Sequence, residues 1–191
     1  MKNQHTRAFT LIELLVVLAI ASILITLAAP SFRDFYRSSQ LSSQVNTLIA
    51  ALHTAKNEAI KNNLYSYLVP NDGSSWESGW TIFVDTDFDQ DFTDGTDIKV
   101  MQSDGLPASI SIEATGSAGS ASPYVSFDGS GYPRENNNSP EALTFTLKIK
   151  GLSDADALQN TRHVIMAMTG RIRSCKPASL NDDSCKSTST E

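Results

Sequence analysis

Ala8-Phe9-Thr10-Leu11-Ile12-Glu13 begins the stretch that decides the fold of this 191-residue chain. Phe9 to Ala29 is an apolar run whose only ionisable side chain is Glu13. As a helix rising about 1.5 Å per residue, the run would span roughly 31 Å, which matches a bilayer core of about 30 Å. Lys2 and Arg7 precede the run, and the positive-inside bias places them on the cytoplasmic side. The sequence therefore predicts a membrane-spanning helix over 9–29, with the bulk of the chain outside the cytoplasm.

The alternative interpretation of this segment is a secretory signal peptide. Small-residue patterns that could end such a peptide occur at Ala19-Ile20-Ala21 and Leu27-Ala28-Ala29. Against it, the apolar run exceeds the roughly 7–15 residues of a signal-peptide core. A charge at the centre of a membrane helix also costs on the order of 2.5–3.5 kcal/mol. Glu13 lies near one end, where the cost is smaller, so its carboxylate either reaches the interface alone or has a partner.

The string from Ala8 to Glu13, between a short basic leader and an apolar run, resembles the cleavage motif of type IV prepilins and pseudopilins. The resemblance implies that a prepilin peptidase removes residues 1–8 by cutting before Phe9 and methylates the new amine. Ala8 stands where the family usually has Gly. The resemblance also implies that Glu13 neutralises the amine of a neighbouring pilin during assembly. A buried pair of this kind fixes register, because either charge left alone is penalised.

Helical periodicity resumes after Pro30, which removes a backbone donor and where the resemblance places a helix kink. Over 30–63, apolar residues recur at spacings of three and four, which indicates one buried face of an amphipathic helix. That face consists of Leu41, Val45, Leu48, Leu52, Ala55 and Ala59. His53 falls outside it and is expected to be solvated, and Asn62-Asn63 is a plausible stop.

From Leu64 onward the pattern changes to short β-prone runs separated by Gly, Pro, Asn, Asp and Ser. The expected strands are Tyr65–Val69, Trp80–Asp85, Ile98–Gln102, Ile110–Glu113, Tyr124–Asp128, Leu143–Lys150 and His163–Met168. Residues 115–122 and 132–140 read as loops. The predicted fold class is α+β: a long N-terminal helix packed on a β-rich domain over 64–191, with two antiparallel sheets.

Two further stretches resemble the GspH/FimT group of minor pilins and pseudopilins. They are Gly79-Trp80-Thr81-Ile82-Phe83-Val84-Asp85 and Thr169-Gly170-Arg171-Ile172-Arg173-Ser174-Cys175. The resemblance implies a subunit present in small amounts at the tip or base of a pilus or of a type II secretion pseudopilus.

The chain is acidic, with 15 Lys+Arg against 21 Asp+Glu and a net charge of −6, which argues against a general nucleic-acid coat protein. Much of the acidity lies in Asp85 to Asp97, with six carboxylates in 13 residues. Calcium prefers oxygen ligands, so a site is conceivable. An EF-hand loop starting at Asp85 would need Gly at its sixth position and Glu at its twelfth, where this chain has Gln90 and Thr96. A solvated acidic hairpin is therefore the preferred interpretation, and no metal or cofactor is predicted.

Cys175 and Cys185 are the only cysteines. In an exported domain the oxidising compartment favours a disulfide, which would close the C-terminal tail against the last strand. A free thiol pair or a metal site are the alternatives. Zinc usually takes four ligands, and only His53 and His163 remain once the leader is removed.

Residues 157–181 contain no acid and four basic side chains, Arg162, Arg171, Arg173 and Lys176. If Gly170–Cys175 is a strand, Arg171 and Arg173 share a face while Ile172 points inward. Two guanidinium groups on one edge suit phosphate oxygens. Gly170-Arg171-Ile172-Arg173 also resembles a stretch that in some FimT-like members is implicated in binding DNA during transformation. The alternative is that these arginines pair with carboxylates on this domain or on a neighbouring pilin.

No enzyme signature is present: the sequence lacks a nucleophile elbow, a phosphate loop and a zinc-protease motif. We therefore expect a minor type IV pilin that primes or caps pilus assembly, with a type II secretion pseudopilin and a DNA-uptake pilin as alternatives. Its partners would be other minor and major pilins or pseudopilins, the prepilin peptidase, the inner membrane and, for the last alternative, DNA. It would cross the bacterial inner membrane once, with its C-terminal domain in the periplasm, before entering the filament.

Overall fold

A computed structural model describes residues 10–152, 154–179 and 182–185 of the chain. The predicted cleavage site at Ala8 and Phe9 lies outside these residues. The chain divides into two compact units between Ser39 and Gln40.

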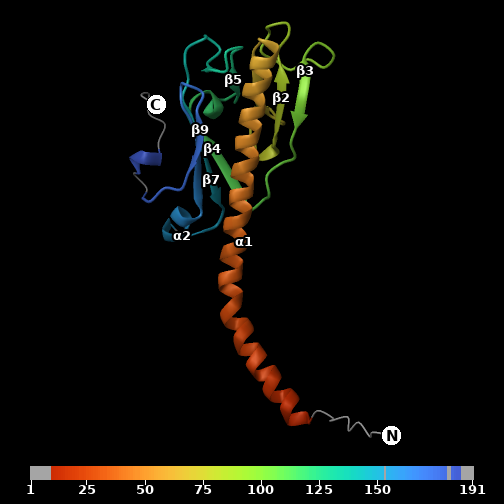
Figure 1. Ribbon diagram of the computed structural model, residues 1–191, viewed down its shortest axis with the longest axis vertical. Helices are drawn as coiled ribbons and strands as arrows, with labels where there is room; N and C mark the ends of the chain where they lie inside the picture. Colours follow the sequence, from red (N-terminus) through yellow and green to blue (C-terminus); the bar gives the residue numbers. More distant parts are fainter. Residues whose placement is uncertain (1–9, 153, 180–181, 186–191) are drawn as a thin grey trace, which may run out of the picture. The chain divides into compact units, whose positions relative to one another are not determined.

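Helix α1 (Leu11–Asn62) is a single helix of 52 residues that contributes to both units (Figure 1). It passes through Pro30 without interruption, although the missing N–H removes one backbone hydrogen bond there. The kink at Pro30 stays a prediction. At the other end Asn63 adopts a left-handed φ of 53°, and the N–H of Leu64 donates to the carbonyl of Ala59 at 3.3 Å. This C-terminal motif ends the helix at the predicted stop.

The second half of α1 buries the predicted apolar face. Leu41, Leu48 and Leu52 are fully buried, as are Ala55 and Ala59. Val45 belongs to the same core cluster, and His53 is exposed as predicted. The helical spacing of the sequence was therefore sufficient to identify which side of α1 packs on the domain.

Nine strands form two sheets in which all neighbouring strands are antiparallel. The five-stranded sheet has the order β3 (Ile98–Gln102), β2 (Trp80–Val84), β1 (Ser66–Pro70), β5 (Val125–Phe127) and β6 (Pro133–Arg134). The four-stranded sheet has the order β4 (Ile110–Ala114), β7 (Leu143–Ile149), β8 (Thr161–Met166) and β9 (Ile172–Cys175). The predicted fold of a long helix on two antiparallel sheets is thus confirmed.

One hydrophobic core joins α1 to the inner faces of both sheets. Leu68 and Ile82 come from the first sheet, and Phe145 and Val164 from the second. The Ser66 hydroxyl donates to the Ala55 carbonyl at 2.6 Å and ties β1 directly to α1. Alternation turns the other side chains of each strand to the opposite face, where Tyr67 and Phe83 of the first sheet are also buried.

The seven expected strands correspond to strands in the structure, with ends that coincide or differ by at most two residues. Five of the described elements were not predicted, and two of them are the short 3-10 helices Trp76–Ser78 and Asp183–Cys185. Helix α2 (Asp154–Gln159) precedes β8, the two-residue β6 lies in the predicted loop 132–140, and a short 3-10 helix (Gly116–Gly119) lies in the loop 115–122. β6 exists because Arg134 pairs with Ser126 of β5, a contact that local propensity does not encode.

Candidate functional site

Thr10 and Glu13 cap the beginning of α1. The N–H and the hydroxyl of Thr10 donate to one carboxylate oxygen of Glu13 at 2.9 and 3.0 Å. In return, the Glu13 N–H donates to the Thr10 hydroxyl at 3.2 Å. This reciprocal arrangement is a capping box, and the Thr-x-x-Glu spacing was the signal for it in the sequence. The carboxylate predicted to act in assembly therefore also helps to start the helix.

The first turns of α1 expose an apolar surface on every side. Each Leu, Ile and Val between residues 11 and 26 is at least half exposed. A helix that is apolar all round is stable only when lipid or other protein surrounds it. Among the described residues, no helix is long and apolar enough to cross a membrane. The span over 9–29 stays a prediction.

The acidic stretch Asp85–Asp97 joins β2 to β3, so the predicted hairpin is confirmed. Its two end residues are buried rather than solvated, with Asp85 1% and Asp97 9% exposed. Asp85 accepts from the N–H groups of Phe88 at 2.7 Å and Gln90 at 3.1 Å. Asp97 accepts from those of Thr86 at 2.9 Å and Thr93 at 2.8 Å. These two carboxylates shape the loop, and the protein tolerates their burial because their oxygens accept hydrogen bonds.

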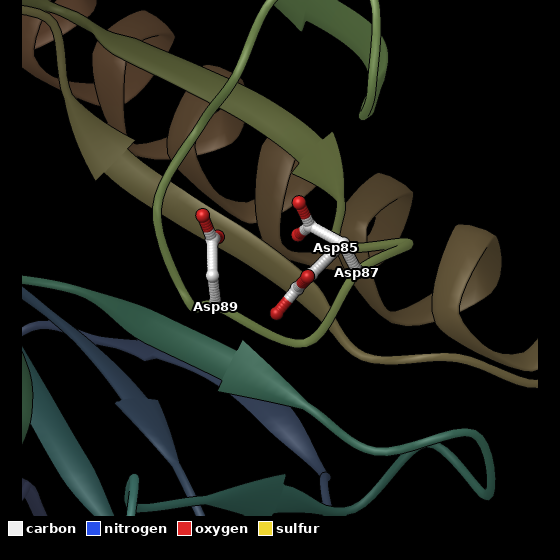
Figure 2. A group of neighbouring side chains, drawn as sticks. All are labelled: Asp85, Asp87 and Asp89. Atoms are coloured by element: carbon white, nitrogen blue, oxygen red, sulfur yellow. The ribbon is translucent and has the colours of Figure 1, made fainter.

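Figure 2 shows that Asp85, Asp87 and Asp89 bring their carboxylates together at the start of this loop. One oxygen from each lies within 4.8 Å of the others. Partial desolvation, followed by the charges of Asp89 and Asp97, raises the pKa of the exposed Asp87 carboxyl. Calcium requires six to eight oxygens, and the cluster brings together one oxygen from each of three carboxylates. The cluster is therefore a concentration of negative charge rather than a prepared metal site.

A groove of about 710 Å³ lies over the outer face of β1 and β2, beside this loop. Its floor includes Tyr67 and Phe83, whose rings stack with centroids 5.4 Å apart. Phe92 packs over Phe83 at 5.5 Å, and Asp89 and Asp91 line the same groove. The groove thus combines an aromatic floor with exposed carboxylates. No single stretch of sequence predicts this combination, because the lining residues come from several segments.

Tyr67 is 3% exposed, and its hydroxyl, which makes no hydrogen bond among the described residues, is not fully enclosed. Burial, reinforced by the charge of Asp85, raises the pKa of this phenol well above its usual range. The hydroxyl therefore stays protonated and available as a donor.

Cys175 and Cys185 form the predicted disulfide, with their Cα atoms 5.6 Å apart. The bridge folds the tail back on β9, where Cys185 is 2% exposed. The Arg173 guanidinium donates to the Ser184 carbonyl at 3.0 Å and adds a second link between the strand and the tail. Because both thiols are oxidised, neither cysteine is available as a zinc ligand.

The four basic residues near the C-terminus do not form one cluster. Arg171 precedes β9 and is exposed, and Lys176 follows it and is exposed. Arg173 lies within β9, while Arg162 on β8 donates to the carbonyls of Gln159 and Thr161. Ile172 packs against the core as predicted. Arg171 and Lys176 are thus the more exposed of the four side chains.

Glu141 is a buried carboxylate that the sequence analysis missed. It is 3% exposed and accepts from the Ser117 N–H at 2.6 Å and the Ser117 hydroxyl at 2.7 Å. Burial raises its pKa, and the two hydrogen bonds oppose that shift. The residue stands in a polar loop sequence, where nothing local indicates burial.

The fold is similar to that of solved minor pilins and pseudopilins. The type IV minor pilin FimU of Pseudomonas aeruginosa matches with a TM-score of 0.52 and 20% identity, over 71% of this chain and 87% of that one. A second crystal form of FimU matches with a TM-score of 0.53 and 19% identity, over 70% of this chain and 91% of that one. The minor pseudopilin EpsH of the Vibrio cholerae type 2 secretion system matches with a TM-score of 0.51 and 14% identity, over 73% of this chain and 99% of that one. These likenesses establish a pilin-like fold.

The family model for the type II transport protein GspH matches residues 44–170, and the model for the prokaryotic N-terminal methylation motif matches residues 3–29. The chain therefore belongs to the GspH family and carries an N-terminal methylation motif. Both expectations from the sequence, the pilin class and the GspH/FimT group, are confirmed. A search of curated proteins found no match.

Proposed function

We propose that the chain is a minor pilin that enters a type IV pilus at low copy and helps to prime or cap its assembly. As a precursor it would be held in the inner membrane by 9–29, with the folded unit on the periplasmic side. After cleavage before Phe9, the helix would pack against the helices of other pilins. The role is structural, with no chemical step and no cofactor.

The observation that carries this proposal is the exposed, all-round apolar surface of α1 from Leu11 to Ile25. The described hydrophobic core does not use this part of the helix, because every residue of the core cluster lies at Leu41 or beyond. Lipid and then neighbouring pilin helices would cover that surface. The carboxylate of Glu13, placed at the helix start, supports pairing with the amine of the adjacent subunit.

Mass spectrometry of the mature N-terminus tests the first step. We expect a methylated Phe9 after expression with a prepilin peptidase, and an uncleaved chain when Phe9 is replaced by a charged residue. A mature chain that begins near Ser31 would mean an ordinary signal peptide and would refute the proposal. Glu13→Gln is the matched variant for assembly: it should be cleaved and methylated normally but enter filaments poorly.

The type II secretion pseudopilin is the second candidate, favoured by the description of the matching GspH family model. Deleting the gene in its host separates the two. Loss of surface pili with normal secretion supports the pilus role, whereas loss of secreted enzymes with normal pili supports the pseudopilin role.

A further inference from the structure

The face of α1 just beyond the apolar run carries three exposed aromatic side chains. Phe32 is 70% exposed, Phe35 69% and Tyr36 61%. Spacings of three and four residues bring them to one side of the helix. The hydrophobic core cluster begins along the chain only at Leu41, so these rings take no part in it. An exposed aromatic patch of this kind marks a surface that binds a partner.

An arginine lies beside this aromatic face. Arg33 follows Phe32 directly and is exposed. It forms no ion pair with any side chain that the structure describes. A guanidinium group with exposed rings next to it suits a partner that presents both an apolar surface and anionic oxygens.

The charge of this segment differs from that of the folded unit. Residues 30–39 contain Arg33, Arg37 and Asp34, which give a net charge of +1. Residues 40–191 carry 11 Lys+Arg against 19 Asp+Glu, a net charge of −8. An anionic surface would therefore attract the segment and repel the folded unit.

The place of the segment along the helix matches the headgroup layer of a bilayer. With 9–29 across a hydrocarbon core of about 30 Å, each headgroup layer adds roughly 5–8 Å. A helix rise of about 1.5 Å per residue puts Phe32 about 5 Å beyond Ala29 and Tyr36 about 10 Å beyond it. Tyr and Trp rings are enriched at this depth, and arginines near helix ends extend their charge to it, because such side chains contact acyl chains with one part and water with the other.

We propose that Phe32, Arg33, Phe35 and Tyr36 bind the headgroup layer of an anionic bilayer, with the rings at the acyl boundary and the guanidinium of Arg33 on lipid phosphate. This anchor fixes the depth of the helix in the membrane until the chain enters a filament. The inference rests on the proposed function, because it takes 9–29 as the membrane span, and it adds the class of lipid that the precursor contacts.

Fluorescence quenching by brominated lipids tests the depth of this face. The full-length chain would be reconstituted in vesicles of phosphatidylcholine and phosphatidylglycerol in equal parts. Tyr36→Trp places an indole in the face, and the native Trp76 and Trp80, which are buried in the folded unit, give the wild-type background. We expect bromines near the headgroup end of the acyl chain to quench this indole more strongly than bromines near the terminal methyl.

Leu18→Trp and Ala50→Trp are the depth controls. Leu18 lies in the apolar run, so its indole should be quenched best by the deep bromines. Ala50 is exposed on the part of α1 that belongs to the folded unit, so its indole should be quenched by neither.

Arg33→Gln, made in the Tyr36→Trp background, tests the charge of the lipid. In anionic vesicles it should lower the population bound at the headgroup layer by about fivefold, because each basic residue near such a surface contributes about that factor. In phosphatidylcholine alone it should have little effect. Arg171→Gln is the matched control, because Arg171 is exposed but lies in the folded unit, and it should change neither result.

An indole that is not quenched in Tyr36→Trp but is quenched in Leu18→Trp would overturn this inference alone, as would equal quenching in Ala50→Trp. An indole that is not quenched in Leu18→Trp would remove the span and with it the proposed membrane-held precursor. Equal effects of Arg33→Gln and Arg171→Gln, or of Arg33→Gln in both kinds of vesicle, would overturn the contact with anionic lipid. Quenching in Tyr36→Trp that disappears as the protein-to-lipid ratio rises would show that another protein molecule covers the face instead.

Discussion

Ser117 and Glu141 form a buried pair in which both donors of the serine meet one carboxylate. Gly116 is required beside them: its φ is 64°, and a Cβ there would lie 2.5 Å from a Glu141 oxygen. The pair closes the 115–121 loop onto the second sheet and depends on the protonation of a single carboxyl group.

Replacing Glu141 with Gln should change how stability depends on pH. The folded-state pKa of Glu141 is raised by burial, so the folded protein binds this proton more tightly than the unfolded chain does. Its contribution to stability is therefore fully present below the unfolded-state pKa of about 4.3 and is lost as pH rises through the folded-state value.

Thermal melts between about pH 4 and 8 measure this effect. The difference in melting temperature between wild type and Glu141→Gln should favour wild type most at the acidic end and shrink toward neutral pH. Glu113→Gln is the control, because Glu113 is exposed and forms a surface ion pair with Lys148. A difference that grows as pH rises would contradict the assignment.

At the scale of elements, β9 and its tail depend on two links, the disulfide and the Arg173 bond to Ser184. The chain-entropy model assigns a loop of this length about 2–3 kcal/mol.

Replacing Cys175 and Cys185 with Ser should therefore lower the free energy of unfolding by about 2–3 kcal/mol. Chemical denaturation with and without reductant measures it. Reductant should destabilise wild type by the same amount and leave the double variant unchanged. Wild type that melts identically in both conditions would show that the bridge contributes nothing.

At the scale of the whole molecule, the four basic residues near the C-terminus differ in exposure and in hydrogen bonding, and this difference governs any contact with DNA. Arg171 is exposed, whereas Arg173 is engaged with the tail. DNA contact as an alternative role would therefore depend more on Arg171 than on the pair.

Titration of full-length protein with duplex DNA across salt concentrations separates these residues. Arg171→Gln should reduce the slope of log affinity against log salt by about one, the loss of one phosphate contact. Arg173→Gln should change the slope less and the stability of the tail more. Identical slopes in wild type and Arg171→Gln would remove Arg171 from any DNA site.

Local patterns predicted much of this fold because they report on neighbours along the chain. The spacing from Leu41 to Ala59 identified the buried face of α1, and the alternation of Leu143–Ile149 identified β7. The two cysteines likewise predicted the disulfide, and the N-terminal string predicted the pilin class. In each case the residues that interact are close in sequence or of a rare type.

The strand order, the groove, and the burial and hydrogen bonding of individual polar residues depended on tertiary structure. β1 lies between β2 and β5, which brings Tyr67 beside Ser126 and Phe83. Glu141 is buried because it meets Ser117, 24 residues away, and Arg173 is engaged because a disulfide returns the tail.

The sequence by itself determined the long helix, its buried face, the class of fold and the N-terminal motif, since each rests on short-range periodicity or on a contiguous string. Only the tertiary structure decided which carboxylates are buried, which arginines are open and where a groove forms, because those properties depend on segments that meet from distant parts of the chain.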